Sequence, residues 1–355
     1  MLIQENIPLA PLTTFKVGGP ARYFVEATSE DDVKVAVAQA AERRWPLFIL
    51  GGGTNLVISD EGWPGLVLKI AINGITQPQE LGGDVFQVGA GHVWDSFVAH
   101  AVRGNYAGIE CLSGIPGTVG GTPIQNVGAY GQEVAETITS VHVLEIANGQ
   151  THELNNSHCG FAYRSSIFNT TQLGRYIVLR VTYRLARNSA AKVEYADLKK
   201  YFSGFSSSPS LQQLRDAVRA IRQAKAMLLV EGDDDCRSAG SFFKNPIVTT
   251  AEADRIEAHA YQIGPKESMP RYYSDDGLVK LSAAWLVEHA GIHKGYGHGS
   301  VGISRKHTLA IVNRGGATAR DIIAFKNEIQ RRVLDVWGIT LHPEPVFVGL
   351  QGSCD

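Results

Sequence analysis

Cysteine is scarce in this chain, which carries only four among its 355 residues. They lie far apart, with no CxxC pair and no spacing typical of metal ligands, at Cys111, Cys159, Cys236 and Cys354. This pattern excludes a disulfide-rich secreted scaffold and a cysteine zinc site. We therefore expect free thiols in a reducing compartment, with Cys354 frayed at the C-terminus.

A strong charge of one sign and long apolar runs are also lacking. The formal net charge is −2 and the pI is near 6.6, so nothing favours a nucleic-acid partner. The chain has no apolar run of about 18 residues, the length that a membrane-spanning helix needs. The first residues have neither the basic start nor the apolar stretch of a signal peptide. We expect a cytoplasmic protein, monomeric and without a membrane partner.

The chain does have the composition of a soluble globular protein, with 44% hydrophobic and 19% charged residues. Its length suits two or three domains. Periodicity near the start predicts a strand, a helix capped by Ser29 and a second, buried strand, at residues 22–27, 30–44 and 46–50. Short strands with frequent turns follow at residues 66–70, 85–88, 141–146 and 176–184, and Asn148-Gly149 is a hairpin signal.

The serine-rich stretch Ser203 to Ser210 is the clearest break in composition, and it is a plausible domain boundary. An amphipathic helix is predicted directly after it, ending near Arg222 and Lys225. A late helix begins near Thr318, with Asp321 completing a capping box, and Gly338 ends it. The segment 339–349 is predicted to be a strand that two prolines interrupt.

Two glycine-rich runs could offer backbone N–H groups to an anion. Gly51 to Asn55 leaves a buried strand, which is the context of a phosphate-binding loop, although a simple turn is the alternative. The second run, "GIECLSGIPGTVGGTPIQNVGAYGQE", combines tight turns with small polar donors such as Ser113 and Thr118. Neither run contains a P-loop or a dinucleotide-binding fingerprint.

A literal GxGxxG motif at Gly297 to Gly302 has the wrong context. It follows a predicted helix, Ala283 to His289, and precedes a predicted strand, so we interpret it as a loop. His289 and His293 are four residues apart, but Gly291 separates them and no third ligand has suitable spacing. We expect no metal site.

Seven motifs in order resemble one known family: "TTFKVGGPARYF", "ILGGGTNLVISDEGWPGLVL", "GIECLSGIPGTVGGTPIQNVGAYG", "YRSSIF", "AGSFFKNP", "LSAAWLVEHAGIHKGY" and "HPEPVFVG". The chain resembles the UDP-N-acetylenolpyruvoylglucosamine reductases, the MurB flavoenzymes of peptidoglycan precursor synthesis. "KVEYADL" is similar to the tyrosine-bearing loop of the type I members. The resemblance covers essentially the whole chain.

The resemblance implies an α+β fold, with a two-part FAD-binding domain of the vanillyl-alcohol-oxidase type followed by an α+β substrate-binding domain. The implied boundaries are 1–70 and 71–205 for the two FAD subdomains, 206–340 for the substrate domain and 341–355 for a C-terminal strand returning to the active site. FAD is expected to be bound non-covalently, with NADPH as co-substrate. The expected FAD-binding residues are Gly51, Gly52, Gly53, Thr54, Asn55, Ser113, Gly114, Ile115, Gly117, Thr118, Gly121 and Arg222.

By the same resemblance, Tyr195, Lys225 and Asn245 would hold the diphosphate of a UDP-sugar substrate. NADPH would reduce the FAD, flavin N5 would deliver hydride to C3 of the enolpyruvyl group, and Ser241 would give a proton to C2. Arg164 would lie near the substrate carboxylate and stabilise the negative charge that develops beside it, and Glu344 would be the acid that assists Arg164. The product would be UDP-N-acetylmuramate.

Taken without the resemblance, the same residues have simpler interpretations. Gly240-Ser241 is typical of a turn or a helix cap, Lys225 of a solvated helix end, and Glu344 of a solvent-facing edge strand. The competing function is an oxidase of the same FAD fold that acts on an alcohol or a lactone. It would keep the glycine runs but would have no use for "SFFKNP" or "HPEPVF".

Overall fold

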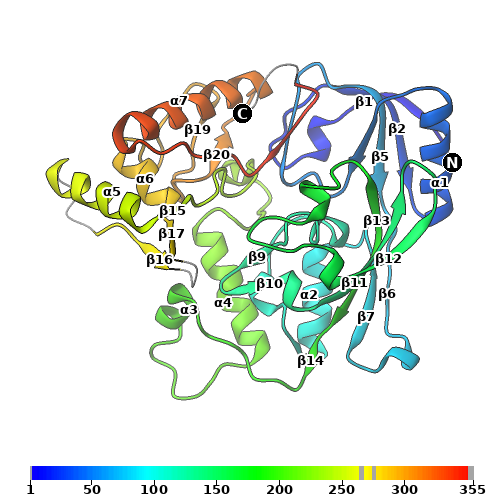
Figure 1. Cartoon of the computed structure of the whole chain (residues 1–355), viewed down its shortest axis with the longest axis horizontal. Helices are drawn as coiled ribbons and strands as arrows, with labels where there is room; N and C mark the ends of the chain where they lie inside the picture. The colour runs from blue at the N-terminus through cyan, green and yellow to red at the C-terminus, as the bar shows by residue number, and fades with distance from the viewer. Residues whose placement is uncertain (1, 264–267, 274–276, 351–355) are drawn as a thin grey trace. The chain divides into compact units, whose positions relative to one another are not determined.

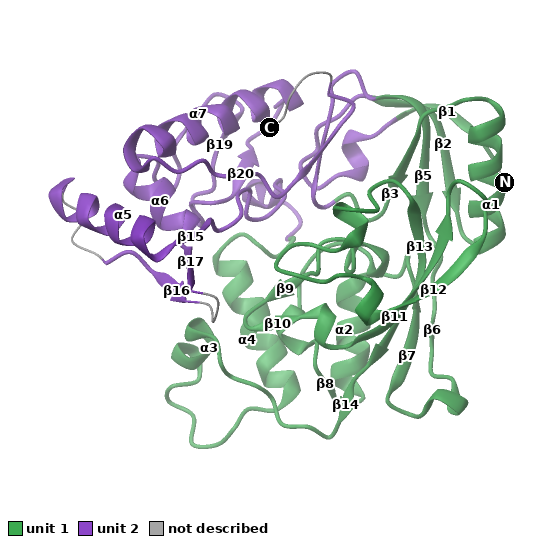
Figure 2. Ribbon diagram, viewed as in Figure 1, with its two compact units in different colours: residues 1–7, 20–53, 63–229 green, residues 8–19, 54–62, 230–355 purple. Residues whose placement is uncertain are grey.

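The computed structural model describes residues 2–263, 268–273 and 277–350. The chain divides into two compact units (Figure 2). Unit 1 consists of residues 1–7, 20–53 and 63–229, and unit 2 of residues 8–19, 54–62 and 230–355. Cys354 and the end of the predicted segment 341–355 lie outside the described residues. We describe each unit by itself.

The first sheet of unit 1 has the strand order β1-β2-β5-β3. Its strands are β1 (Gln4–Pro8), β2 (Pro20–Ala27), β5 (Trp63–Ile70) and β3 (Leu47–Leu50), and β5 pairs in parallel with β2 and β3. Helix α1 (Glu30–Glu42) connects β2 to β3 and buries Val33, Ala36, Val37 and Ala40. Ser29 and Asp32 form its capping box. The predicted strand–helix–strand start is confirmed.

The second sheet of unit 1 is antiparallel, in the order β12-β11-β13-β7-β6. Its strands are β12 (Thr151–Asn155), β11 (Ile138–Glu145), β13 (Tyr176–Arg184), β7 (Val85–Gly89) and β6 (Ile75–Thr76). Gly149 has φ +67° in the connection from β11 to β12, so Asn148-Gly149 makes the predicted hairpin. The short pairs are β8 (Tyr106–Ala107) with β14 (Ala186–Arg187), and β9 (Gly128–Ala129) with β10 (Gln132–Glu133).

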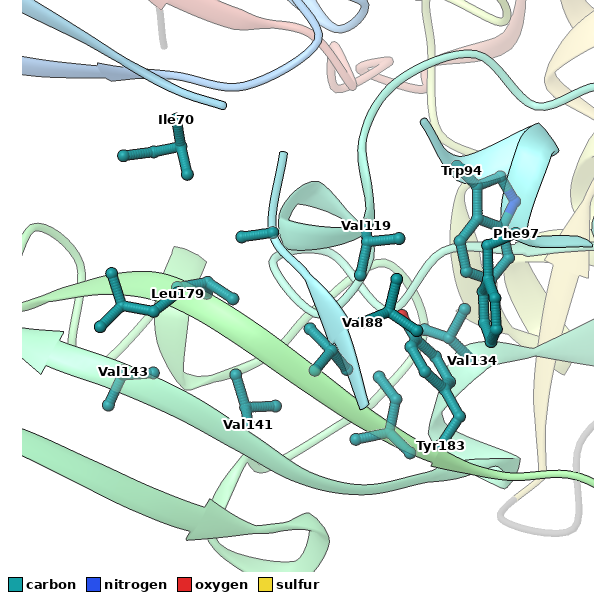
Figure 3. Close-up of a cluster of buried hydrophobic side chains, with 14 of the residues drawn as sticks. Ile70, Val88, Trp94, Phe97, Val119, Val134, Val141, Val143, Leu179 and Tyr183 are labelled. Atoms are coloured by element: carbon teal, nitrogen blue, oxygen red, sulfur yellow. The ribbon is translucent and has the colours of Figure 1, made fainter. Parts of the chain in front are cut away.

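Three further helices complete unit 1: α2 (Trp94–Arg103), α3 (Ala196–Tyr201) and α4 (Leu211–Ala224). Helix α4 is the amphipathic helix predicted after the serine-rich stretch, and its capping box is Ser210 with Gln213. Both sheets and α2 pack around one hydrophobic core, part of which Figure 3 shows between β7, β13 and α2. The polar atoms inside it are satisfied, since Tyr183 bonds Thr122 at 2.7 Å and the Trp94 indole donates to the Leu112 carbonyl.

Within its described residues, unit 2 has two small antiparallel sheets and three α-helices (Figure 1). One sheet has the order β15-β17-β16 and the other β18-β19-β20. Their strands are β15 (Ile247–Thr249), β17 (Leu278–Leu281), β16 (Arg271–Tyr273), β18 (Gly297–His298), β19 (Val301–Ile303) and β20 (Ile311–Asn313). The helices are α5 (Thr250–Ile263), α6 (Ala283–His289) and α7 (Ala319–Trp337).

Some of the sequence predictions for unit 2 are confirmed, and others differ from the structure. The predicted start of α7 is confirmed, with Thr318 as the N-cap and Asp321 completing a capping box. Its predicted end at Gly338 is also confirmed, and this glycine is left-handed. The GxGxxG segment is a tight hairpin between β18 and β19, more regular than the predicted loop. The predicted strand at 339–349 shortens to β21 (Val346–Val348), which pairs in parallel with β4 (Leu56–Ile58). Pro343 and Pro345 lack the N–H groups that a longer ladder needs.

Candidate active site

The two glycine runs predicted to bind FAD lie against each other in unit 1. A Cβ atom added to Gly52 would come within 2.6 Å of the Gly117 Cα, and one added to Gly51 would come within 3.2 Å of the Thr118 hydroxyl. Gly53 has φ +66°, a left-handed conformation that glycine adopts freely. The glycines at 51–53 therefore let two stretches of backbone approach more closely than side chains would allow.

This approach leaves a group of backbone donors for a ligand. Within the described residues, the N–H groups of Gly51, Gly52, Gly53, Gly117 and Thr118 donate no hydrogen bond. Gly52 is exposed, but the other four residues are not, and backbone N–H groups away from solvent are rarely left without an acceptor. Several of them on two adjoining loops form a concavity suited to a phosphate oxygen.

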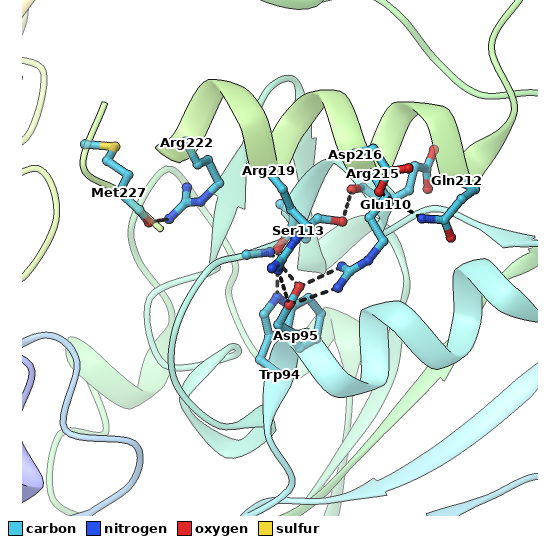
Figure 4. Close-up of polar contacts among 12 residues, drawn as sticks. Trp94, Asp95, Glu110, Ser113, Gln212, Arg215, Asp216, Arg219, Arg222 and Met227 are labelled. Carbon is cyan, nitrogen blue, oxygen red and sulfur yellow. Dashed lines mark hydrogen bonds and ion pairs between the residues drawn. The ribbon is translucent and has the colours of Figure 1, made fainter. Parts of the chain in front are cut away.

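The rest of the second run is held by internal bonds. The Ser113 hydroxyl is buried and donates to the Glu110 carbonyl at 2.6 Å, and Gly114 N–H donates to the Asp95 carboxylate at 2.6 Å. Ile115 packs against the core of unit 1, while no atom lies within 4 Å of a Cβ at Gly121. The Asp95 carboxylate also accepts hydrogen bonds from the guanidinium groups of Arg215 and Arg219 of α4 (Figure 4). Ser113 and Gly114 thus shape the loop.

Arg222 brings a buried positive charge to the end of α4. Its guanidinium donates to the Met227 carbonyl at 2.6 Å (Figure 4), and its Nε has no hydrogen-bond partner within the described residues. Burial lowers the pKa of Arg222, because the charged form loses its hydration. Among the described residues no carboxylate forms an ion pair with Arg222. Its buried positive charge therefore favours an anionic ligand at this place.

Tyr195 and Lys225, both predicted to hold a diphosphate, lie near Arg222 in unit 1. Tyr195 precedes α3 and packs its ring edge-on against Tyr130, with ring centres 5.5 Å apart. Lys225 caps the end of α4 and its Nζ bonds Asp197 of α3 at 2.6 Å. Burial raises the pKa of Tyr130 to about 12, although the Arg222 charge opposes this shift.

Sequence reasoning did not single out Tyr130 or Asp197. Tyr130 stands in the quoted run "VGAYGQE" with φ +50°, and Asp197 stands in "YADL" two residues after Tyr195. For Asp197 the available signal was a carboxylate two residues from the predicted ligand-binding Tyr195, whereas no predicted ligand-binding residue stands near Tyr130 in the sequence. Tyr130 packs on Tyr195 and interacts with Arg222, and Asp197 bonds Lys225. These contacts bring Tyr195, Lys225 and Arg222 close together.

Arg164 lies on a loop of the same unit in a conformation that is unusual for arginine. Its φ is +52°, and its Nη2 donates to the Gly128 carbonyl at 2.9 Å. Asn169 holds the Arg164 carbonyl at 3.2 Å. A left-handed non-glycine residue costs about 1 kcal/mol or more, so the surrounding bonds keep this side chain in a defined place.

Ser241 and Glu344 are brought together by backbone pairing within unit 2. Lys244 N–H donates to the His342 carbonyl at 2.9 Å, and Glu344 N–H donates to the Phe242 carbonyl at 2.8 Å. Phe243 and Pro343 form the bridge between these bonds. The two proposed catalytic side chains therefore stand on adjacent antiparallel segments, Ser241 being next in sequence to Phe242.

Asn55 and Asn245 hold the backbone of the same region. The Asn55 amide donates to the Glu344 carbonyl at 3.1 Å, and the Asn55 carbonyl accepts from Val346 N–H. The Asn245 side-chain oxygen accepts from Ala283 N–H, at the start of α6, at 3.0 Å. This bond turns the amide so that its two N–H donors are directed elsewhere, as a diphosphate-binding group requires. Thr54 contributes its carbonyl to the Thr14 hydroxyl.

His307, in unit 2, is a further residue that sequence reasoning missed. Its Nε2 lies 3.4 Å from the Ser241 hydroxyl oxygen. It stands in "SRKHTLAIV", between β19 and β20, where no spacing connects it with Ser241. A histidine is a neighbour that can donate to a serine oxygen or accept from it, depending on its protonation.

The three consecutive aspartates before Ser241 build the loop that precedes it. Asp233 caps the short 3₁₀ helix Asp234–Cys236, and Asp235 accepts from the Ser304 hydroxyl at 3.0 Å and from Arg305 N–H at 2.9 Å. Asp234 pairs with Arg237. These carboxylates are therefore engaged in fixing the loop against the β19–β20 connection.

Metal and membrane features are lacking in the part of the chain that the structure describes. No group of three or more potential metal ligands gathers there. His289 bonds the Trp285 carbonyl at 2.8 Å and stacks on the Trp285 ring. Among the described helices, none combines the length and apolar character needed to cross a membrane.

Two family models match the chain in the order that the motifs suggested. The model of the FAD binding domain matches residues 21–155. The model of the C-terminal domain of UDP-N-acetylenolpyruvoylglucosamine reductase matches residues 232–348. The predicted fold class, an α+β FAD-binding part followed by an α+β second part, is confirmed, as is FAD as the cofactor of this fold.

Similar proteins extend the match over the whole chain. The UDP-N-acetylenolpyruvoylglucosamine reductases of Thermobifida fusca and Streptomyces avermitilis are each 45% identical to it, covering 98% of the chain and 98% and 96% of their own lengths. The crystal structure of the MurB reductase from Thermus caldophilus superposes with a TM-score of 0.66 at 27% identity, covering 98% of this chain and all of that one. The chain therefore belongs to the UDP-N-acetylenolpyruvoylglucosamine reductase family of flavin-dependent oxidoreductases.

Proposed function

We propose that this chain reduces UDP-N-acetylglucosamine enolpyruvate to UDP-N-acetylmuramate with electrons from NADPH, a step in peptidoglycan precursor synthesis. The observation that carries the proposal is the backbone pairing of residues 242–244 with 342–344, which sets Ser241 beside Glu344. An oxidase acting on an alcohol or a lactone would have no need of that pair. The four-part division at residues 70, 205 and 340 remains part of this proposal.

The residues present fit FAD. The N–H groups of Gly51 to Gly53, Gly117 and Thr118 suit its diphosphate, and the buried Arg222 suits an anionic partner. Gly121 leaves open space, and Ile115 offers an apolar surface. When bound, FAD supplies the two-electron chemistry that moves hydride from NADPH to C3 of the enolpyruvyl group.

The diphosphate of the UDP-sugar is assigned to Tyr195, Lys225 and Asn245. Lys225 supplies a charge that is half exposed and already paired with Asp197, so a ligand can replace that partner at little cost. Asn245 supplies neutral amide donors whose orientation the bond to Ala283 fixes. Neutral donors and a single cation hold a charged group that must later leave.

Hydride addition at C3 places negative charge at C2, delocalised into the adjacent carboxylate. We assign Arg164 to that carboxylate, because a planar guanidinium offers paired donors that match a carboxylate, and its bond to the Gly128 carbonyl holds it in a defined place. We assign to Glu344, whose N–H donates to the Phe242 carbonyl, the role of the acid that assists Arg164. One such donor aimed at developing charge lowers the activation barrier by about 3 kcal/mol.

Ser241 then transfers its hydroxyl proton to C2. The hydroxyl is a weak acid, so a neighbour must stabilise the oxygen that remains. His307 is placed for this, with Nε2 at 3.4 Å from the Ser241 oxygen. A proton returned through His307 or from water restores the hydroxyl for the next turnover.

The test separates the two half-reactions without oxygen. NADPH should bleach the flavin absorbance at about 450 nm, and UDP-N-acetylglucosamine enolpyruvate should restore it with formation of UDP-N-acetylmuramate. Restoration by air but not by the enolpyruvyl nucleotide would show the oxidase instead. Bleaching that neither reagent reverses would contradict both functions.

A further inference from the structure

The Asp95 carboxylate is saturated with hydrogen bonds from other elements. It stands in the first turn of α2 but makes no capping bond to its own helix. Its Oδ1 accepts from Gly114 N–H at 2.6 Å and from Arg215 Nη1 at 2.7 Å. Its Oδ2 accepts from Arg215 Nη2 at 2.9 Å and from Arg219 Nη1 at 2.6 Å. These four donors fill the acceptor capacity of a carboxylate.

These bonds join a loop to a helix. Gly114 belongs to the second glycine run, whereas Arg215 and Arg219 belong to α4 (Figure 4). The contact is close, since a Cβ at Gly114 would meet Leu228 at 2.7 Å and the side chains of Arg219 and Arg222 at 3.6 Å. Asp95 is thus the point at which α2, the loop and α4 are fastened together.

The start of α2 also controls the loop beyond Gly114. Trp94 N–H donates to the Gly117 carbonyl at 3.0 Å, and the Trp94 indole donates to the Leu112 carbonyl at 3.1 Å. Leu112, Gly114 and Gly117 are therefore all tied to two consecutive residues. The last of these bonds is accepted by the Gly117 carbonyl, which lies between the N–H groups of Gly117 and Thr118 that were described above as phosphate donors.

Charge adds to this arrangement. Arg215, Arg219 and Arg222 follow at i, i+4 and i+7, which places them along one side of α4. Asp95 pairs with the first two, and within the described residues no carboxylate forms an ion pair with Arg222. Burial would raise the pKa of Asp95, but the bonds from Arg215 and Gly114 outweigh it and lower that pKa, so the carboxylate is ionised at neutral pH.

We propose that Asp95 is a positioning residue of the cofactor site. It fixes Gly114 against α4, and so sets the places of the Gly117 and Thr118 donors and of the Arg222 guanidinium relative to one another. A simple stabilising ion pair would hold the helices together without any effect on FAD. The proposal rests on the assignment of this loop and Arg222 to FAD.

The experiment compares Asp95→Asn and Asp95→Ala with Glu145→Gln in the FAD-loaded protein. Glu145 is a matched control, because its carboxylate also takes several bonds, from Arg175, Asn148 and His152, at the far hairpin of unit 1. The readouts are the FAD dissociation constant from flavin fluorescence on dilution, the flavin midpoint potential and the thermal midpoint. Asp95→Asn keeps the shape and two acceptor sites, so it serves where Asp95→Ala does not fold.

The expected result is an FAD dissociation constant raised at least about tenfold in Asp95→Ala, with a shifted potential, and a smaller rise in Asp95→Asn. Glu145→Gln should lower the thermal midpoint and leave both flavin readouts unchanged. An unchanged FAD affinity and potential in both Asp95 variants would overturn the proposal. Wild-type protein that holds no FAD would instead contradict the proposed function.

Discussion

Ser241 and Glu344 owe their places to backbone bonds rather than to side-chain packing. The bond from Glu344 N–H to the Phe242 carbonyl fixes one segment on the other, and the Asn55 amide holds Glu344 from its far side. Such bonds leave few alternative positions for either side chain. If both groups act in catalysis as proposed, a pair held in this way is preorganised before the substrate binds.

Lys225 gives the prediction at the level of one residue. Its assigned role is binding the diphosphate, so Lys225→Ala should raise the KM for the enolpyruvyl nucleotide about tenfold with a smaller change in kcat. Its pair with Asp197 is half exposed on both sides, so the variant should lose less than about 1 kcal/mol of stability. Steady-state kinetics at saturating NADPH measure both constants.

The control for this prediction is Lys200→Ala, which removes an exposed lysine from α3. It should leave both constants unchanged. A KM in Lys225→Ala equal to that of the wild type would refute the diphosphate role.

At the level of elements, the glycine loops depend on a contact between two backbones. Gly52→Ala would set a Cβ at 2.6 Å from the Gly117 Cα, and a backbone atom cannot move aside as a side-chain tip can. The loops must then separate and their N–H donors lose their common direction. We expect the FAD dissociation constant to rise at least about tenfold.

Gly83→Ala is the matched control, because nothing lies within 4 Å of a Cβ at that position. Flavin fluorescence titration of both variants measures the effect. Equal FAD affinity in Gly52→Ala and Gly83→Ala would show that the loops do not cradle the cofactor.

The sequence predicts those elements whose signals are local. The helix starts at Ser29 and Thr318, the Asn148-Gly149 turn and the helix end at Gly338 each depend on signals within a few residues, and all are confirmed. The strand at the C-terminus is shorter than predicted because two prolines precede it. How far prolines shorten a strand depends on the strand with which it pairs, here β4. Period and composition do not reveal that partner.

The site was predictable only in part, for the same reason. Asp95 and Arg215 are 120 residues apart, and Ser241 and His307 are 66 apart, so no spacing connects them. Single-sequence patterns report nearest neighbours along the chain and one face of an element. Asp95, Tyr130, Asp197 and His307 act through contacts between elements, and these became visible only in the folded chain.

At the level of the whole molecule, each unit is assembled from separate stretches of the chain. Unit 2 combines residues 8–19 and 54–62 with the C-terminal part, and its bond from Asn55 to Glu344 spans 289 residues. Contacts of such separation favour slow folding, because loop closure must precede them. The same bond connects Asn55, the last residue of the first glycine run, with Glu344, two residues before β21.

The cysteines give a prediction for the folded molecule. Burial raises the pKa of Cys111 to about 12 and that of Cys159 to about 11, and it also raises the pKa of Cys236. Only the thiolate reacts, so these three thiols should be labelled far more slowly by iodoacetamide at neutral pH in native than in denatured protein. Mass spectrometry of each peptide measures this. Native labelling as fast as in urea would contradict the buried core.

In the proposed mechanism Ser241 supplies the proton for the second half-reaction. Stopped-flow absorbance of Ser241→Ala measures this most directly, first with NADPH and then, without oxygen, with UDP-N-acetylglucosamine enolpyruvate. NADPH should bleach the flavin at close to the wild-type rate, because that step needs no proton from Ser241, and recovery with the nucleotide should be slowed about 10²-fold or more. Equal slowing of both half-reactions, or recovery at the wild-type rate, would contradict it.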